Sequence, residues 1–359
     1  MSFKKVAIIG LGLIGGSLAK AVRHANQSIF ICAFDRPETL KKAKNEKVID
    51  EELTIIDDAL KSDLIILALP IEQSLKVFKE LAPRLNSNQV ISDLCSVKGI
   101  FADEWKTFSS KGKYIGAHPM TGKEKSGYDN SDLLLYENSV FIICAENEND
   151  ETLKSYFDFV KLIGARIVLL NAHLHDRITA HVSHLPQLIS VLLMNQANSK
   201  MDNFALLDFA AGGFRDMTRI ASSDFKIWES ILRYNKNDIL KTLNLFQDQI
   251  STLKKLIEED DYKSIGNQFE NARLARNEIP INTKGFIDPL YDITVFVKDQ
   301  PGMISKISTI LFENKINIKD IELLKIREGT GGNFKFYFES ETDASKAKLL
   351  IINAGFNIQ

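Results

Sequence analysis

A glycine-rich turn lies near the start of the chain, between a short apolar run and a segment that favours a helix. The run covers residues 5–9 and the turn begins at Gly10. Gly10 permits a tight turn, Gly12 lets the backbone approach a pyrophosphate, and Gly15 lets the helix pack close to the strand. The helix start also offers unpaired N–H groups to phosphates. The pattern predicts a dinucleotide-binding unit whose cofactor contacts include Gly10, Gly12, Leu13, Ile14 and Gly15.

A second apolar run, residues 29–34, ends at Asp35, twenty positions after Gly15. A carboxylate at this place accepts hydrogen bonds from an adenosine ribose and repels a 2′-phosphate, which favours NAD over NADP. Arg36 follows directly and would accommodate that phosphate, so the sequence leaves NADP open. The structural alternative for Asp35 is a turn residue ahead of Pro37.

The length and charge of the chain limit the classes of protein to which it can belong. Its 359 residues exceed the usual size of one domain, so we expect two or three. Forty-five basic and 47 acidic residues give a net charge of −2, which provides no basic field for nucleic acid or an anionic membrane. No apolar stretch reaches the roughly 20 residues that span a bilayer. We therefore expect neither nucleic acid nor a membrane as a partner.

The cysteines and the N-terminus indicate the compartment. Cys32, Cys95 and Cys144 are scattered, odd in number and form no Cys-x-x-Cys pair. They are typical of reduced thiols in a cytoplasmic protein without structural zinc. The first five residues lead into a short strand rather than a signal sequence with a cleavage site. We expect a cytoplasmic protein.

Short apolar runs alternate with amphipathic segments over residues 1–170. This rhythm predicts an α/β domain with a parallel sheet and helices on both faces. The expected strands are residues 4–10, 29–34, 63–69, 89–92, 114–117, 139–144 and 166–170. The expected helices are residues 14–25, 37–46, 71–82 and 150–163.

The strand signal vanishes over residues 171–281, where segments with a 3.6-residue period predict an all-helical domain. The helices expected there are residues 172–198, 201–210, 223–233, 235–259 and 262–276. A linker is expected at residues 280–285, extending to Pro289. Residues 290–359 then follow the order βαββαβ of a ferredoxin-like unit.

Three of the predicted strands lead into residues that could act on a ligand. Leu69 and Pro70 end one strand and are expected to line the cofactor crevice. Ser96 follows the next strand, at the same edge where ligands gather, and is a candidate cofactor contact. A helix N-cap is the simpler role for a lone serine. His118 follows the strand after that, where an imidazole is well placed for acid–base chemistry near neutral pH.

The helical region contains two pairs of side chains that would share a helix face. His181 and His184 are three apart, but a metal would need a third ligand, so we expect no metal site. Arg215 and Arg219 are four apart and could together bind a carboxylate. A surface network with Asp216 is the alternative for this pair.

Several stretches together resemble the prephenate dehydrogenase family, the enzymes of tyrosine biosynthesis, over essentially the whole chain. The matching stretches are residues 10–17, 92–98, 116–127, 183–186 and 212–221. The resemblance implies a Rossmann-type domain, a helical dimerisation domain and a C-terminal ACT domain. It also implies NAD-dependent oxidative decarboxylation of prephenate to 4-hydroxyphenylpyruvate, in a homodimer.

The resemblance further implies roles for individual residues. The histidine matching His118 contacts the ring hydroxyl of the substrate, and the serine matching Ser96 orients it; both count as catalytic. The glutamate matching Glu124 shapes and gates the pocket, and the arginine matching Arg219 binds a substrate carboxylate. The tryptophan matching Trp228 reaches in from the partner subunit.

Two departures from the family pattern concern the substrate. The family often has histidine where this chain has Gln187 and lysine where it has Arg215. Both positions border the side chain of the substrate, so prephenate and its amino analogue arogenate both stay open. His184, in the matching Ser-His-Leu-Pro stretch, joins Gln187 and Arg215 among the expected substrate-binding residues.

The C-terminal unit suggests regulation. ACT domains bind amino acids near an Asp-x-x-Gly turn, here Asp299–Gly302. The resemblance therefore implies an aromatic amino acid as feedback effector; we expect tyrosine, while phenylalanine or no effector at all stays open. Three alternatives remain for the whole chain: an arogenate dehydrogenase, a β-hydroxyacid dehydrogenase, or a non-catalytic sensor of NAD and amino acids. A β-hydroxyacid dehydrogenase would rely on a lysine in the helical domain and would lack the ACT-like unit.

Overall fold

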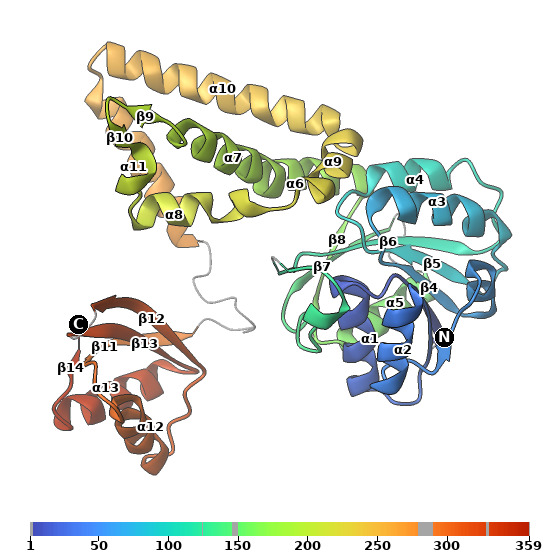
Figure 1. The fold of residues 1–359 in the computed structure, drawn as a ribbon, viewed down its shortest axis with the longest axis horizontal. Coiled ribbons are helices and arrows are strands. Elements are labelled where there is room, and N and C mark those ends of the chain that lie inside the picture. The colour runs from blue at the N-terminus through green and yellow to red at the C-terminus, as the bar shows by residue number, and fades with distance from the viewer. Residues whose placement is uncertain (1–2, 124, 146–149, 279–289, 328–329, 359) are drawn as a thin grey trace. The chain divides into compact units, whose positions relative to one another are not determined.

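The computed structural model describes residues 3–123, 125–145, 150–278, 290–327 and 330–358 (Figure 1). The chain divides into two compact units, Met1–Asn267 and Gln268–Gln359. The predicted linker after residue 279 and the predicted gating residue Glu124 lie outside the described residues. No helix in the described ranges is long and apolar enough to cross a membrane.

The first unit contains an eight-stranded sheet in the order β3-β2-β1-β4-β5-β6-β7-β8. From β3 to β6 this is the order typical of a dinucleotide-binding sheet, in which ligands bind at the carboxyl ends of the strands. The strands are β1 Lys5–Ile9, β2 Phe30–Phe34, β3 Glu51–Glu52, β4 Leu64–Leu67, β5 Val90–Asp93, β6 Lys113–Pro119, β7 Val140–Cys144 and β8 Arg166–Leu170.

The prediction of a wholly parallel sheet is wrong at one pair of strands. β7 runs antiparallel to β6, whereas the other neighbouring pairs in this sheet are parallel. A parallel return needs a crossover that usually contains a helix. Between β6 and β7 the described chain has only a 3₁₀ turn, Tyr128–Asn130, so the strand returns in the opposite direction.

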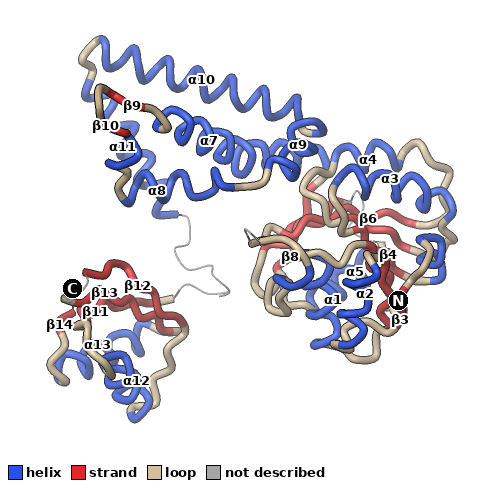
Figure 2. The backbone as a smooth tube through the Cα atoms, viewed as in Figure 1, coloured by secondary structure: helices blue, strands red, loops and turns tan. Residues whose placement is uncertain are grey.

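Helices cover both faces of this sheet, as predicted (Figure 2). Successive residues of β1 alternate between two hydrophobic clusters, because neighbouring side chains in a strand point to opposite faces. Val6 and Ile8 pack in one cluster, and Ala7 and Ile9 pack in the other. The helices are α1 Leu13–Ala25, α2 Pro37–Asn45, α3 Ile71–Leu81, α4 Gly99–Trp105 and α5 Glu151–Leu162.

A helical region follows β8, as predicted. Its helices are α6 Ala172–Thr179, α7 Leu185–Ala197, α8 Gly212–Thr218, α9 Phe225–Tyr234, α10 Lys236–Glu258 and α11 Tyr262–Glu278. A π-helical turn, Ala180–His184, separates α6 from α7, so the expected helix 172–198 is interrupted. Such turns are frequent at functional sites.

The helix expected at residues 201–210 does not form. The chain makes a small hairpin of β9 Lys200–Met201 and β10 Phe204–Ala205, then a 3₁₀ turn, Leu206–Phe209. Asp202 occupies the tight turn with a positive φ of 53°. The apolar spacing of this segment comes from exposed side chains such as Met201 and Phe204, and not from the buried face of a helix.

The second unit contains a four-stranded antiparallel sheet in the order β12-β13-β11-β14. Its elements are β11 Tyr291–Val297, α12 Met303–Glu313, β12 Asp320–Arg327, β13 Gly331–Phe338, α13 Glu341–Asn353 and β14 Asn357–Ile358. The predicted βαββαβ order is confirmed, and its last strand, β14, lies at an edge of the sheet. With these two sheets and the helical region, the predicted fold class is confirmed.

Candidate active site

The glycine turn after β1 has the shape that the sequence predicts. Gly10 has a φ of +100°, and a Cβ there would lie 2.7 Å from the Ala68 carbonyl oxygen. A Cβ on Gly15 would lie 1.9 Å from the Gly10 carbonyl oxygen, so both positions require glycine. A Cβ on Gly12 would meet nothing within 4 Å, and α1 begins directly after it with no side-chain cap. The turn therefore leaves open space and unpaired N–H groups where a pyrophosphate fits.

Asp35 directly follows β2, beside this turn. Its Oδ2 accepts a hydrogen bond from the Leu11 N–H (2.6 Å), and its Oδ1 accepts one from the Arg36 N–H (2.6 Å). The exposed Arg36 guanidinium lies 3.8 Å from Asp35 and 3.7 Å from Glu38. Two carboxylates thus flank Arg36, the residue that the sequence indicates as a possible contact for a 2′-phosphate.

The Leu69-Pro70 pair borders the same turn. A Cβ on Gly10 would lie 2.9 Å from Leu69 Cδ2, so Leu69 packs directly on the glycine backbone. Pro70 is exposed and precedes the first residue of α3. Both roles expected for this pair, a strand end and a wall of the crevice, are compatible with this placement.

His118 lies in β6, at the same edge of the sheet. Because β6 is the third neighbour of β1, it stands roughly 15 Å along that edge from the glycine turn. The His118 side chain is half-buried, and its Nδ1 lies 2.7 Å from Nε2 of His175 in α6. His175 is fully buried, and its Nδ1 lies 2.8 Å from Oδ1 of Asp176. Two imidazoles and a carboxylate thus form one hydrogen-bonded line.

Burial determines the charge of these histidines. Loss of solvent lowers the pKa of His118 well below its usual value, and the adjacent His175 and Lys98 lower it further. Burial also lowers the pKa of His175, against the opposing effect of Asp176. Both rings are therefore neutral at physiological pH, and a neutral imidazole is the form that accepts a proton.

Asp176 also caps helix α4. Its Oδ1 accepts a hydrogen bond from the Lys98 N–H (2.8 Å), and its Oδ2 accepts one from the Gly99 N–H (2.7 Å). The alternative that Ser96 is the N-cap is therefore wrong, because α4 begins three residues later and a carboxylate from α6 caps it. The half-buried Ser96 hydroxyl makes no side-chain hydrogen bond within the described part of the chain.

A buried ion pair lies beneath His118. Lys98 and Asp93 are both fully buried; Lys98 Nζ contacts Asp93 Oδ1 and donates to the Ala117 carbonyl oxygen at 2.7 Å. The Tyr114 hydroxyl donates to Asp93 Oδ2 at 2.8 Å. Two buried charges are tolerated here because they are paired and hydrogen-bonded. The pair fixes the backbone directly before His118.

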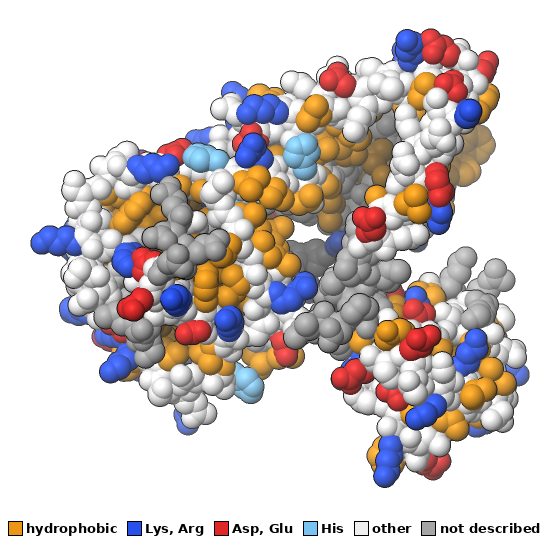
Figure 3. Space-filling view, turned by 180° about the vertical axis from the view of Figure 1, so that it is seen from behind, with side chains coloured by type: hydrophobic (Ala, Val, Ile, Leu, Met, Phe, Trp, Pro, Cys, Tyr) orange, Lys and Arg blue, Asp and Glu red, His pale blue; other side chains and the backbone are white. Residues whose placement is uncertain are grey.

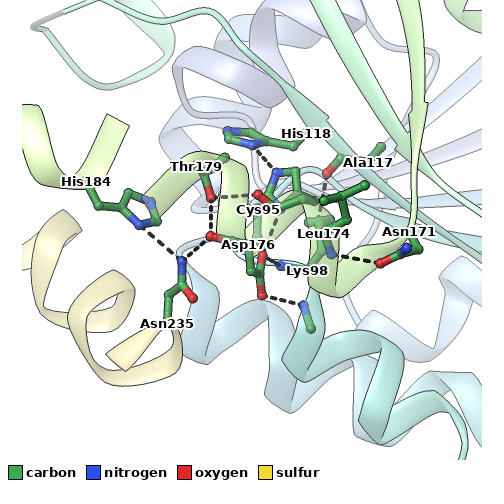
Figure 4. Close-up of polar contacts among 12 residues, drawn as sticks. Cys95, Lys98, Ala117, His118, Asn171, Leu174, Asp176, Thr179, His184 and Asn235 are labelled. Carbon is green, nitrogen blue, oxygen red and sulfur yellow. Dashed lines mark hydrogen bonds and ion pairs between the residues drawn. The ribbon is translucent and has the colours of Figure 1, made fainter. Parts of the chain in front are cut away.

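His184 lies in the π-helical turn. Asn235 Nδ2 donates to its Nδ1 (3.2 Å) and to the Asp176 carbonyl oxygen (2.8 Å; Figure 4). Burial lowers the pKa of His184 to about 4. The Trp228 ring, half-buried in α9, stands edge-on to His184 of the same chain, with centroids 5.9 Å apart. The entry of Trp228 into a partner's site stays a prediction.

The two predicted carboxylate-binding residues are exposed. Arg215 lies in α8, and Arg219 begins the 3₁₀ turn that follows it. Gln187, by contrast, is buried: its Nε2 donates to the Ile220 carbonyl oxygen at 2.9 Å, and Ser223 Oγ lies 3.5 Å from its Oε1. Gln187 thus fastens the segment that carries Arg219.

Comparisons with known proteins match each part of the chain to a described domain family. A family model described as prephenate dehydrogenase, nucleotide-binding domain, matches residues 18–169; its dimerization-domain counterpart matches residues 171–271; and an ACT domain model matches residues 291–350. The prephenate dehydrogenase of Bacillus subtilis (strain 168) is 31% identical over 352 residues, which cover 96% of this chain and 95% of that protein. The chain belongs to the prephenate dehydrogenase family.

Solved structures extend the comparison to the fold of this prephenate dehydrogenase family member. The crystal structure of prephenate dehydrogenase from A. aeolicus, in complex with hydroxyphenyl propionate and NAD+, matches with a TM-score of 0.71 and 29% identity, over 78% of this chain and 99% of that one. That of Synechocystis arogenate dehydrogenase matches with a TM-score of 0.69 and 26% identity, over 76% and 99%. The chain is an NAD-dependent oxidoreductase, and the predicted family, enzyme class and cofactor are confirmed.

Sequence reasoning missed several residues of the hydrogen-bonded group that includes His118, Asp176 and His184. These are Asp93, Lys98, His175, Asp176 and Asn235. Lys98 stood in a quoted motif, and His175 was one of several histidines after β8. Two signals were available in the sequence: the charged pair Asp93 and Lys98, five residues apart after a strand, and the dipeptide His175-Asp176 in the first half of a helix. Within the residues that the structure describes, no cluster of three His, Cys, Asp or Glu could hold a metal.

Proposed function

We propose that this protein catalyses the NAD-dependent oxidative decarboxylation of prephenate to 4-hydroxyphenylpyruvate. The observation that carries the proposal is the neutral His118 imidazole at the carboxyl edge of the sheet, hydrogen-bonded through Nδ1 to a buried partner. Family membership supports the same reaction, since relatives named prephenate dehydrogenase match nearly the full chain.

In the proposed reaction, NAD held at the Gly10–Gly15 turn would supply the hydride acceptor for C4 of the substrate ring. His118 Nε2 takes the proton of the C4 hydroxyl, and Ser96 orients that hydroxyl. The ring carboxylate then leaves as CO2, and the electrons of the broken C–C bond complete the aromatic ring. His118 returns its proton to the C4 oxygen, which gives the ring hydroxyl of the product and restores the neutral imidazole. General-base help of this kind is worth roughly 10²–10⁴-fold.

The helical region supplies the proposed substrate contacts. Arg219 binds a substrate carboxylate through its guanidinium fork, and Arg215 adds positive charge nearby. Gln187 acts on the substrate through the Arg219 segment that it fastens. His184, Trp228 and Glu124 complete the proposed pocket.

The cofactor residues are proposed from their place in the turn. Gly10, Gly12, Gly15, Leu13 and Ile14 surround the pyrophosphate position at the start of α1. Asp35 binds the ribose, and Leu69 with Pro70 lines the crevice. The carboxylates of Asp35 and Glu38 on either side of Arg36 oppose a 2′-phosphate, which supports the preference for NAD.

The helical region is also the proposed homodimer surface. Its family model is described as a dimerization domain, and hydrophobic side chains are visible over the surface in Figure 3. Large apolar side chains on α10 are exposed in the single chain, and so large an apolar surface usually marks an interface. These are Leu240, Leu245, Ile250, Leu253 and Ile257.

Tyrosine is the proposed effector of the C-terminal unit. The turn at Asp299–Gly302 borders a cavity of about 290 Å³ that Met303, Ser305 and Phe334 also line. A cavity with an aromatic wall beside a polar turn suits an aromatic amino acid. Replacing the exposed Ser305 by tryptophan fills the cavity, and we expect tyrosine inhibition to disappear while kcat and KM without tyrosine stay unchanged. Persistent inhibition would place tyrosine at the active site instead.

One assay tests the activity. The protein is incubated with NAD and prephenate while NADH absorbance is followed, and arogenate is run in parallel. We expect NADH with prephenate; NADH only with arogenate establishes the second candidate, which the likeness to Synechocystis arogenate dehydrogenase favours. No NADH with either substrate leaves the sensor alternative.

A further inference from the structure

We propose that His175 and Asp176 are positioning residues that hold His118 in one tautomer, with the hydrogen on Nδ1 and the proton-accepting lone pair on Nε2. The inference rests on the proposed base role of His118. It assigns a part in the reaction to two side chains of α6, of which His175 contacts His118 directly.

The direction of the hydrogen bonds begins at Asp176. Its two oxygens accept hydrogen bonds from the Lys98 and Gly99 backbone N–H groups, which are donors only. These N–H groups belong to the start of α4, where the helix dipole favours negative charge. Asp176 is therefore a carboxylate with acceptor atoms only, and His175 Nδ1, 2.8 Å from Oδ1, must donate.

The positions of the remaining hydrogens follow because each neutral imidazole ring carries one N–H hydrogen. With its hydrogen on Nδ1, His175 has a lone pair on Nε2, which accepts a hydrogen bond from His118 Nδ1 at 2.7 Å. His118 then has its own lone pair on Nε2. If His175 were doubly protonated, His118 would instead carry its hydrogen on Nε2 and could not act as a base there.

Burial keeps His175 in the neutral form. The ring is fully buried, and loss of solvent lowers its pKa. The charged groups that face it are Asp176 on its own helix and the Lys98–Asp93 pair below it, and that pair is neutral overall. His118 and His184 also lie close, and both are neutral because burial lowers their pKa values.

The line also stabilises the product of proton transfer. When His118 Nε2 takes the proton of the substrate hydroxyl, the ring becomes an imidazolium with its hydrogen still on Nδ1. That hydrogen bond to His175 Nε2 becomes charge-assisted and stronger, and Asp176 polarises His175 in the favourable direction. No proton needs to leave His118 during the step, so atoms and charges balance within it.

A pair of substitutions at His175 tests the inference. His175→Leu removes the acceptor, and we expect kcat to fall at least 100-fold with KM for the substrate within threefold. His175→Gln places an amide oxygen near the former Nε2, which still accepts from His118 Nδ1, so we expect kcat within tenfold of wild type. Thr179→Val is the matched control: it removes a buried hydroxyl from the same helix without touching the imidazole line, and should leave kcat unchanged.

A spectroscopic measurement needs no turnover. Nitrogen-15 shifts of His118 in the full chain, identified by their loss in His118→Asn, report which ring nitrogen carries hydrogen. We expect Nδ1–H in the wild type and in His175→Gln, and a shift toward Nε2–H in His175→Leu. Wild-type protein with Nε2–H overturns the inference, as does full kcat in His175→Leu or a His175→Gln variant as slow as His175→Leu.

The two proposals fail separately. If wild type produces no NADH from prephenate or arogenate, the proposed function is wrong, and the nitrogen-15 shifts still decide the tautomer. If wild type is active and His118→Asn is not, but His175→Leu keeps full kcat, only the positioning role is wrong. Should His175→Leu fail to fold, the wild-type shifts and the His175→Gln rate still decide it.

Discussion

The two halves of the proposed active site differ in burial and in how fully their side chains are hydrogen-bonded within one chain. The acid–base half, from His118 to Asp176, is hydrogen-bonded throughout, and His175, Asp176 and Lys98 are buried. The carboxylate-binding half, Arg215 and Arg219, is exposed. A base needs a fixed tautomer and a dry environment before the substrate arrives. The exposed guanidinium groups stay in contact with solvent, because moving a charge out of water is costly.

The largest effect is expected from breaking the buried half. His118→Asn removes the base, and kcat should fall roughly 10²–10⁴-fold while substrate binding changes little. Steady-state kinetics with NAD and prephenate measure both quantities. His173→Asn is the control, because it makes the same change at an exposed histidine paired with Asp103. An unchanged kcat in His118→Asn would contradict the role of this residue.

The next largest effect is the loss of stability that acid should cause in the buried half. A histidine with a pKa near 6.5 in the unfolded chain and about 4 in the folded protein, as for His184, binds protons more readily when unfolded. The contribution of this group to the free energy of unfolding is therefore fully present above about pH 6.5. It is lost as the pH drops toward 4, and the loss is about 3 kcal/mol. Urea unfolding at several pH values measures the slope, which His184→Gln should reduce. An identical slope in the variant would show that another group is responsible.

A smaller effect, confined to KM, is expected in the exposed half. Arg219→Ala should raise KM by roughly 30- to 150-fold, since a hydrogen bond to a charged group is worth about 2–3 kcal/mol. The control Arg233→Ala removes an exposed arginine that pairs with Glu229 and should leave KM unchanged. A fall in kcat with constant KM would show that Arg219 acts in the transition state instead.

The smallest expected effect separates the halves without mutation. At 0.1 M salt, the attraction between exposed charges is largely screened beyond a separation of about 10 Å, whereas buried pairs are screened much less. KM should therefore rise a few-fold between low and moderate salt, while kcat stays constant. If kcat and KM changed together, the contrast between a buried and an exposed half would be lost.

The sequence predicted those parts of the site that are local patterns. The glycine turn, the Asp35 that follows β2 and the His118 that ends its strand each follow from a few adjacent residues. The contact between His118 and His175 joins positions 57 apart, and it exists only because α6 packs beside α4. No periodicity encodes that packing. Similarly, apolar spacing at residues 201–210 looks helical in sequence, but the exposed Phe204 and Phe209 leave it without a buried face.

Asp176 connects two tasks that are usually separate. The same carboxylate closes the start of α4 in the nucleotide-binding part and orients a ring in α6 of the helical part. Any opening between α4 and α6 would therefore disturb the hydrogen bonds that run from Asp176 through His175 to His118, and His118 could then no longer act as the base. The proposed reaction therefore requires α4 and α6 to be in contact at the moment of proton transfer.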